Sequence, residues 1–175
     1  MQYELHTSSL KQQAERLRAG DRVLLSGQII TSRDAAHKRY FEAIGKNEPL
    51  PIDLKSSVIY YAGPTPAPEN LPIGSCGPTT SSRMDPYAPK LLDMGLIAMI
   101  GKGPRSSEVC DAIIRNKSVY FCSIGGAGAL AARCVRSCEV LAYDDLGCES
   151  VKRLEIEDMP LIVAIDCSGG NLFSR

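Results

Sequence analysis

Two threonines and an arginine stand close together directly after a glycine and a proline that constrain the backbone. They lie within 75-SCGPTTSSRMD-85, which follows a proline-rich run. Thr79 and Thr80 supply hydroxyl groups, and Arg83 supplies a fixed positive charge four residues after Thr79. Neutral donors beside one cation suit a small polyanion better than a nucleic acid. The same residues also suit a helix N-terminus with several Ser and Thr caps.

A second candidate site lies near the start of a predicted helix. It is the stretch 31-TSRDAAHKR-39, in which either Thr31 or Ser32 can cap the helix. If Ser32 is the cap, Arg33 lies in the first turn, where free backbone N–H groups and the helix dipole favour an anion. His37 shares the face of Arg33 and can titrate near neutral pH. The stretch is either a carboxylate clamp or an exposed helix with ordinary surface charges.

A third candidate is a lysine between two glycines, directly after the apolar run 96–100. It is Lys102, within 101-GKGP-104. A P-loop has four residues between its first glycine and its Gly-Lys pair; here Gly95 is one residue too far away and Gly103 follows the lysine, which disfavours nucleotide hydrolysis. Open α/β sheets place ligand-binding groups at the carboxyl ends of strands. Lys102 is therefore either such a group or a solvated turn residue.

A fourth candidate is the glycine motif Gly126-x-Gly128-x-x-Ala131, which follows an apolar strand and opens a helix. Asp144 and Asp145 come about where a ribose-binding acid would lie, so the motif raises the hypothesis of a dinucleotide site. Against it, the predicted helix is short for a crossover. Close packing of helix and strand is the alternative reason for these glycines.

Alternating strands and helices position these candidates and predict an α/β fold with a mixed, largely buried sheet. The hydrophobic pattern predicts strands over 2–6, 22–27, 28–31, 57–62, 96–100, 118–124, 138–143, 152–157 and 161–167. Helices are predicted from a capping box at Ser9 to Gly20 and over 33–44, 86–94, 105–116 and 125–135. The segment 63–78 holds five prolines and is predicted to be a long, stiff loop.

Composition narrows the class of protein. A chain of 175 residues is predicted to form a single domain over 1–175. Twenty basic residues balance twenty acidic ones, which gives no case for nucleic acid or an anionic membrane as a partner. The apolar runs are too short for a membrane span and the N-terminus lacks the core of a signal peptide, so we expect a cytoplasmic protein. Seven cysteines without a C-x-x-C motif indicate free thiols and no metal site.

Several of these stretches together resemble the β subunit of the iron-sulfur hydro-lyases of the class I fumarate hydratase and L(+)-tartrate dehydratase family. The resemblance covers nearly the whole chain, in order. It includes TSRDAAHKR, IYYAGPTPAP, GSCGPTTSSRMD, MIGKG and the closing LGCESVKRLEIEDMPLIVAIDCSGGNLF. It implies a swivelling β/β/α domain, equivalent to the C-terminal domain of the one-chain fumarases.

The resemblance also implies a partner and a set of site residues. An α subunit, whose cysteines hold a [4Fe-4S] cluster, would face this chain across the active site. Arg33, Arg83 and Lys102 match the residues that bind the substrate carboxylates, and Thr79 matches a threonine proposed as the base that removes a proton from carbon. His37 lies in a matching motif and is a lesser candidate for proton transfer.

The expected activity is the reversible hydration of fumarate to L-malate, a reaction of the tricarboxylic acid cycle. The alternatives are tartrate dehydration to oxaloacetate, a dinucleotide-binding domain and a non-catalytic partner subunit. The chain alone should be inactive, and it is expected to assemble as a homodimer or an α2β2 complex.

Overall fold

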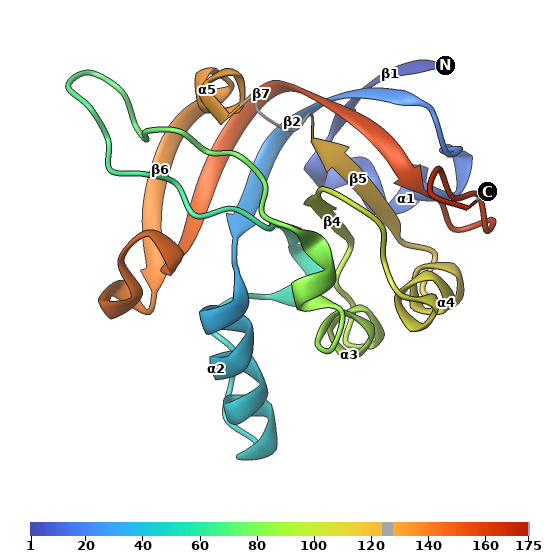
Figure 1. Cartoon of the computed structure of the whole chain (residues 1–175), viewed down its shortest axis with the longest axis horizontal. Coiled ribbons are helices and arrows are strands. Elements are labelled where there is room, and N and C mark those ends of the chain that lie inside the picture. The colour runs from blue at the N-terminus through green and yellow to red at the C-terminus, as the bar shows by residue number, and fades with distance from the viewer. Residues whose placement is uncertain (124–127, 175) are drawn as a thin grey trace.

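The computed structural model describes residues 1–123 and 128–174, which form one seven-stranded sheet with helices around it (Figure 1). The strands are β1 (Gln2–His6), β2 (Arg22–Thr31), β3 (Val58–Tyr60), β4 (Ala98–Gly101), β5 (Val119–Ser123), β6 (Val135–Ala142) and β7 (Val151–Ile165). Their order is β1-β2-β3-β4-β5-β7-β6. Strands β1 to β5 pair in parallel, whereas β7 is antiparallel to β2, β5 and β6. The mixed sheet with helices confirms the predicted α/β fold.

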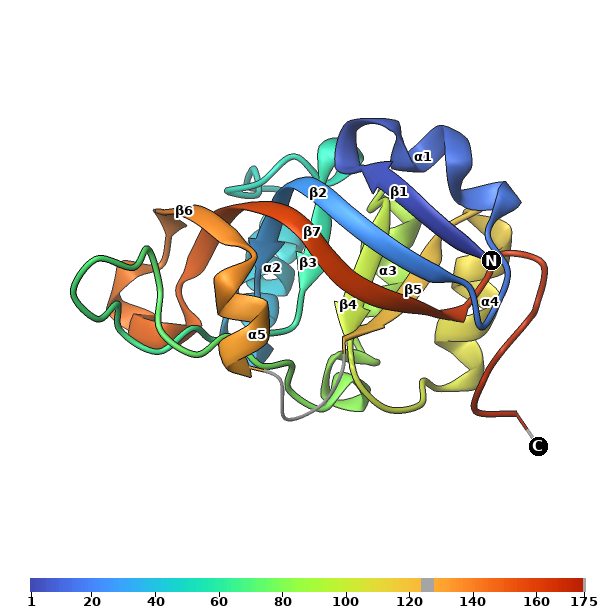
Figure 2. The ribbon, with the colours of Figure 1, turned by 90° about the horizontal axis from the view of Figure 1, so that it is seen from above.

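Five of the strands form a closed ring. Strand β2 pairs with β3 on one side and with β7 on the other, and β7 also pairs with β5. The ring therefore runs β2–β3–β4–β5–β7 and back to β2, with β1 and β6 attached outside it. Figure 2 shows β2 and β7 curving side by side across the molecule.

Two pairs of predicted strands are in fact single long strands. The predicted strands 22–27 and 28–31 form β2, in which the register shifts at Gly27, a glycine with a φ of 106°. The predicted strands 152–157 and 161–167 form β7, which contains Asp158 with a φ of 51°. A bulge bends a strand and leaves one residue unpaired, but the ladder continues on both sides. The prediction was wrong because it interpreted each irregularity as an end.

The helices predicted from Ser9 to Gly20 and over 86–94 and 105–116 are shorter in the structure, whereas the helix predicted over 33–44 keeps its length of 12 residues. The helices are α1 (Leu10–Gln13), α2 (Asp34–Gly45), α3 (Ala88–Asp93), α4 (Ser107–Arg115) and α5 (Gly128–Arg133), with 3-10 turns at Thr7–Ser9, Ala14–Arg16, Leu54–Ser56, Ser81–Met84 and Asp144–Glu149. The predicted capping box at Ser9 does not form, because the Ser9 hydroxyl donates to the His6 carbonyl oxygen. Helices α2, α3 and α4 lie on one side of the sheet (Figure 1).

Alternate residues of the central strands point into two separate hydrophobic clusters. Val58 and Tyr60 belong to a cluster that also contains Leu10 of α1. Ile59 packs on the opposite face, in a cluster that contains Leu91 of α3. Because both faces are covered, the central strands β3 and β4 are apolar and buried throughout their length.

The proline-rich segment 63–78 is a loop, as predicted, and it folds back on itself. The Thr65 amide donates to the Ser75 carbonyl oxygen at 3.0 Å, and the Gly74 amide donates to the Thr65 carbonyl oxygen at 3.0 Å. At its end, the buried Tyr60 hydroxyl donates to the Cys76 carbonyl oxygen at 2.6 Å. These bonds fix the start of the segment that carries Thr79.

Candidate functional site

The residues singled out from the sequence gather at the carboxyl ends of three neighbouring parallel strands. Arg33 comes two residues after the end of β2, and Lys102 directly follows β4. Thr80 forms a parallel bridge with Lys102, and the Thr79 amide donates to the Tyr61 carbonyl oxygen, just beyond β3, at 2.7 Å. The carboxyl edge of the strands thus holds all three segments, which is where α/β sheets bind ligands.

Arg33 and Arg83 converge on one carboxylate. The Arg83 Nε donates to Asp34 Oδ1 at 2.9 Å, and the Arg33 Nε lies 4.0 Å from Asp34 Oδ2 and 3.4 Å from Glu149 Oε1. The Arg83 side chain is 53% exposed and the Arg33 side chain 23% exposed. Two cations therefore flank a carboxylate at the rim of the sheet, in a place that solvent reaches.

Buried side-chain atoms without a hydrogen-bond partner concentrate around this carboxylate. Among the described residues, they are Thr31 Oγ1, Arg33 Nε, Asp34 Oδ2, His37 Nε2, Tyr40 OH and Glu149 Oε1. All of them belong to the end of β2, to the first turns of α2 or to the neighbouring turn that ends at Glu149. Three of these atoms, Arg33 Nε, Asp34 Oδ2 and Glu149 Oε1, belong to the ion pairs above. Folded proteins pair nearly all buried polar groups, so the cluster makes the start of α2 a candidate site.

Helix α2 begins one residue later than the sequence predicts. Arg33 is its N-cap, and no side chain caps it. Ser32 is not the cap because its hydroxyl lies 3.2 Å from His37 Nδ1 and its amide donates to the Tyr60 carbonyl oxygen. Asp34 occupies the first turn, where the helix dipole favours a negative charge.

His37 lies beneath the site and is fully buried. Its Nδ1 lies 2.8 Å from the Arg33 carbonyl oxygen; because a carbonyl only accepts, Nδ1 carries the proton and Nε2 does not. The ring lies 5.6 to 5.7 Å from the rings of Tyr40, Tyr61 and Tyr87. Burial lowers the pKa of His37 from 6.5 to about 4, so the ring is neutral at physiological pH. Its part in proton transfer stays a prediction.

The shifted pKa of His37 predicts a pH-dependent stability. The unfolded chain takes up a proton on this residue below pH 6.5, whereas the folded chain does so only near pH 4. Stability is therefore retained above pH 6.5 and falls as the pH drops toward 4, by about 2 kcal/mol between pH 7 and 5. Urea unfolding of His37→Asn should show a pH dependence smaller by this amount. An equal pH dependence in both proteins would contradict the prediction.

Lys102 and Thr79 keep their functional groups free. Within residues 1–123 and 128–174, no carboxylate lies within ion-pairing distance of the Lys102 ammonium group. The Thr79 hydroxyl likewise has no hydrogen bond to a described side chain or backbone group, and Lys102 is exposed. These groups are available to a ligand at the same edge as Arg33 and Arg83.

The sequence predictions missed a buried ion pair beneath the two loops. Arg105, whose side chain is 0% exposed, donates from Nε to Asp85 Oδ1 at 2.6 Å. Its guanidinium lies 5.3 Å from the centre of the Tyr61 ring and 4.9 Å from that of Tyr120. Asp85 follows Arg83, and Arg105 follows Lys102, so the pair ties together the two loops of the site. In the sequence, the signal for this ion pair is that Asp85 and Arg105 each lie close to a candidate site residue.

The glycine motif lies partly outside the described residues, because Gly126 is not among them. Gly128 and Ala131 belong to α5. A Cβ atom on Gly128 would lie 2.3 Å from Ser75 Oγ and 3.1 Å from the Gly77 amide, and the Gly128 carbonyl oxygen accepts from the Cys76 amide. Gly128 therefore allows close packing against the loop that precedes Thr79.

The described residues bring no group of three potential metal ligands together. All seven cysteines are free thiols.

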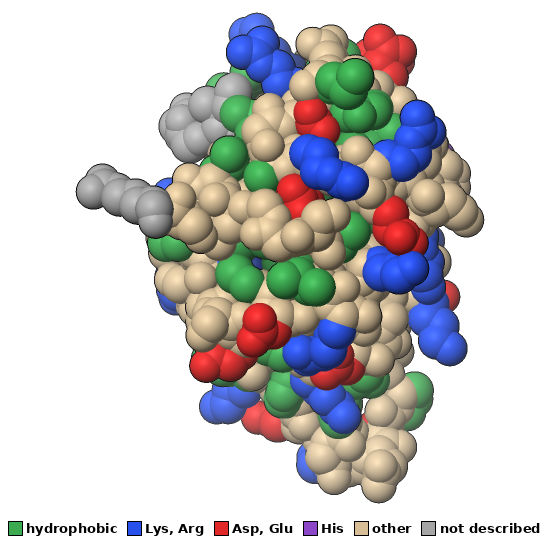
Figure 3. All heavy atoms as spheres, turned by 90° about the vertical axis from the view of Figure 1, so that its right-hand side faces the viewer, with side chains coloured by type: hydrophobic (Ala, Val, Ile, Leu, Met, Phe, Trp, Pro, Cys, Tyr) green, Lys and Arg blue, Asp and Glu red, His purple; other side chains and the backbone are tan. Residues whose placement is uncertain are grey.

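On the face shown in Figure 3, Lys and Arg side chains are interspersed with Asp and Glu side chains, unlike the basic surface that binds nucleic acid. No helix in the described part of the chain combines the length and apolar character of a membrane span.

The structure thus combines a mixed α/β fold with three cationic side chains, Arg33, Arg83 and Lys102, at one carboxyl edge of the sheet. Residues 1–175 match the family described as Fumarase C-terminus, and the chain belongs to this family, as the resemblance implied. It is 39% identical over 168 residues to fumarate hydratase 2 of Leishmania major, covering 95% of this chain and 30% of that protein. Against the aerobic class I fumarate hydratase of Salmonella typhimurium, identity is 38% over 170 residues, with 96% and 29% covered.

A relative of similar length is the putative L(+)-tartrate dehydratase subunit beta of Methanocaldococcus jannaschii. Identity is 37% over 171 residues, which cover 94% of this chain and 88% of that one. By contrast, the chain spans about 30% of the length of the two fumarate hydratases.

Proposed function

We propose that this chain is the β subunit of a two-subunit hydro-lyase that catalyses the reversible hydration of fumarate to L-malate. The observation that carries the proposal is the convergence of Arg33 and Arg83 on one carboxylate, at the strand edge that also bears Thr79 and Lys102. The fumarate hydratases among the relatives support this substrate.

The three cations, Arg33, Arg83 and Lys102, suit the binding of a dicarboxylate. Asp34 binds only the Nε of Arg83, and no other described side chain forms a hydrogen bond or ion pair with this guanidinium, so its two terminal nitrogens are free for a bidentate contact with a carboxylate. Arg33 lies on the other side of Asp34. Removing a proton next to a carboxylate builds negative charge there, which the fixed charge of Lys102 would stabilise.

Thr79 is the proposed base, and a threonine hydroxyl is a weak one. No described residue accepts its proton, so the role depends on the positive field of Arg83 and Lys102 or on a group from the partner. If the hydroxyl is the base, Thr79→Val should lower kcat by about a thousandfold. Thr79→Ser keeps the hydroxyl and should retain most activity. Steady-state kinetics test this, and comparable kcat values for the valine and serine variants would assign Thr79 a binding role only.

The proposal includes an α subunit as partner and a [4Fe-4S] cluster held by that subunit. The described residues of this chain do not fit a cluster, since no three potential ligands gather. One relative is named as the beta subunit of a putative tartrate dehydratase, which supports a partner subunit. Within the proposed complex, this chain contributes the cations and the threonine, as one β subunit of an α2β2 assembly.

Dehydration of L(+)-tartrate to oxaloacetate is the second candidate, favoured by one observation. The relative whose length this chain matches is named as the beta subunit of a tartrate dehydratase. The cationic edge described above has charges that suit either dicarboxylate.

One assay distinguishes the substrates. The purified chain is mixed with its α partner and the cluster is reconstituted. The absorbance of fumarate is followed with L-malate as the starting acid, and the formation of oxaloacetate is followed with tartrate as the starting acid. Formation of fumarate from L-malate supports the first proposal, and formation of oxaloacetate from tartrate supports the second. If an intact cluster is present and neither acid reacts, both proposals fail; NAD binding by the isolated chain would then favour a dinucleotide-binding domain.

A further inference from the structure

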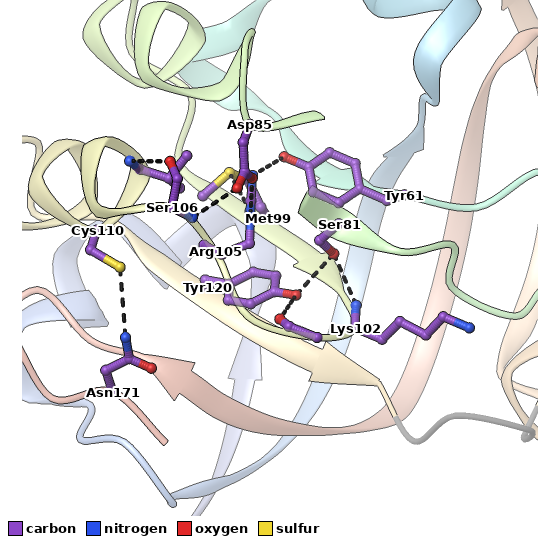
Figure 4. Close-up of polar contacts among 12 residues, drawn as sticks. Tyr61, Ser81, Asp85, Met99, Lys102, Arg105, Ser106, Cys110, Tyr120 and Asn171 are labelled. Atoms are coloured by element: carbon purple, nitrogen blue, oxygen red, sulfur yellow. Dashed lines mark hydrogen bonds and ion pairs between the residues drawn. The ribbon is translucent and has the colours of Figure 1, made fainter. Parts of the chain in front are cut away.

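The loop that carries Thr79 and Arg83 is joined to Lys102 by reciprocal hydrogen bonds through Ser81. The Ser81 amide donates to the Lys102 carbonyl oxygen at 3.1 Å, and the Lys102 amide donates to Ser81 Oγ at 2.9 Å. Ser81 is fully buried, whereas Lys102 is exposed. In Figure 4 the Lys102 side chain extends away from Ser81 and Tyr120. The backbone of Lys102 is therefore fixed from beneath while its ammonium group stays free.

Tyr120 of β5 extends this contact into a chain of hydrogen bonds. Its hydroxyl lies 2.9 Å from Ser81 Oγ and 3.0 Å from the Gly103 carbonyl oxygen. Because the carbonyl only accepts, the Tyr120 proton goes to Gly103 and the Ser81 hydroxyl donates to the Tyr120 oxygen. This series of hydrogen bonds runs from the Lys102 amide through the Ser81 and Tyr120 hydroxyl groups to the Gly103 carbonyl oxygen. It therefore fixes the backbone on both sides of the Lys102 side chain.

The end of β4 is shaped for this contact. A Cβ atom on Gly101 would lie 1.9 Å from Ser81 Oγ and 2.9 Å from Tyr61 Cδ2. Any side chain at this position would push Ser81 away from Lys102. Burial also raises the pKa of the Tyr120 phenol, so it remains a neutral donor.

We propose that Ser81 and Tyr120 are positioning residues that hold Lys102 in register with Thr79 and Arg83. The inference rests on the proposed hydro-lyase function and adds two residues that do not touch the substrate. If Lys102 stabilises charge that develops on the substrate carboxylate, a small displacement of its backbone weakens the transition state more than the bound substrate.

The first test compares two buried serines. Ser118 lies at the opposite end of β4 and β5, is 1% exposed, and donates to the Ile97 carbonyl oxygen at 2.7 Å. Ser81→Ala and Ser118→Ala each remove one buried hydroxyl and should lower the thermal midpoint of the chain similarly. In the complex with the α subunit, Ser81→Ala should lower kcat for fumarate hydration about tenfold, with KM changed far less. Ser118→Ala should leave kcat unchanged.

The second test removes the same chain of hydrogen bonds from its other end. Tyr120→Phe keeps the ring against Arg105 but loses both hydroxyl contacts, and it should also lower kcat about tenfold. Since the two hydroxyl groups act in series, the double variant should lose no more activity than Ser81→Ala alone. If the losses of kcat in the two single variants add up in the double variant, the two hydroxyl groups do not act in series. If Ser81→Ala does not fold, the kcat of Tyr120→Phe tests the positioning role by itself.

A third measurement does not depend on activity. Hydrogen exchange of the Lys102 amide in the isolated chain should become faster in Ser81→Ala and Tyr120→Phe, but not in Ser118→Ala. The positioning role is overturned if the wild-type complex hydrates fumarate while Ser81→Ala and Ser118→Ala have the same kcat and the same exchange rate at Lys102. An inactive wild-type complex with an intact cluster would instead overturn the proposed function, and the exchange rates would still test the hydrogen-bond chain.

Discussion

Replacing Arg83 with alanine should lower kcat/KM for fumarate hydration about a hundredfold, mainly through a higher KM. The change removes the guanidinium proposed to grip a substrate carboxylate. It also leaves Asp34 with only the more distant Arg33 beside it, so a carboxylate with less compensating charge would face the incoming dianion. Adding Asp34→Asn to Arg83→Ala should therefore recover part of the lost affinity. Steady-state kinetics of the assembled enzyme measure both effects.

Arg115→Ala is the matched control for this experiment. Arg115 is 48% exposed, close to the value for Arg83, and it pairs with Asp93 between α4 and α3, away from the site. Its loss should leave kcat/KM unchanged. If Arg83→Ala and Arg115→Ala have equal kinetics, Arg83 does not bind substrate; if Arg83→Ala fails to fold, its role is structural.

Asp85→Asn should lower the free energy of unfolding by about 3 kcal/mol. The change leaves the guanidinium of Arg105 buried without a counter-charge, although the two tyrosine rings still lie against it. Urea unfolding of the chain, followed by circular dichroism, measures the loss. Replacing both residues, in Asp85→Asn/Arg105→Met, should restore much of the stability, because no isolated charge then remains buried.

Asp93→Asn provides the comparison for this second prediction. Asp93 also accepts hydrogen bonds from an arginine, but both partners are half exposed, so solvent replaces the lost contacts. The midpoint of urea unfolding should hardly move. Equal losses for Asp85→Asn and Asp93→Asn would show that burial of Arg105 contributes nothing.

The edge that carries the site could be predicted from the sequence because it depends on local patterns. An apolar run followed by Gly-Lys-Gly places Lys102 at the carboxyl end of a strand, and the helix pattern after Thr31 places Arg33 at a neighbouring end. Parallel pairing of β2, β3 and β4 then brings these ends together.

The partners of these residues could not be predicted in the same way. Glu149 reaches Arg33 only because the connection between β6 and β7 folds over the start of α2. The start of the helix was also misjudged, because nothing local shows that the Ser32 amide donates to the carbonyl oxygen of Tyr60 in β3. Both errors arise where a tertiary contact outweighs a local preference.

The pairing of β2 with β7 also determines when the molecule can fold. Arg22 pairs with Ile162 and Thr31 with Lys152, so the ring is closed by contacts between opposite ends of the chain. Such non-local contacts slow folding, because a long segment must be ordered before they form. On the ribosome, β2 and β5 have left the exit tunnel before β7 does, and each then presents an unpaired edge open to aggregation. We therefore expect the nascent chain to need protection until β7 emerges.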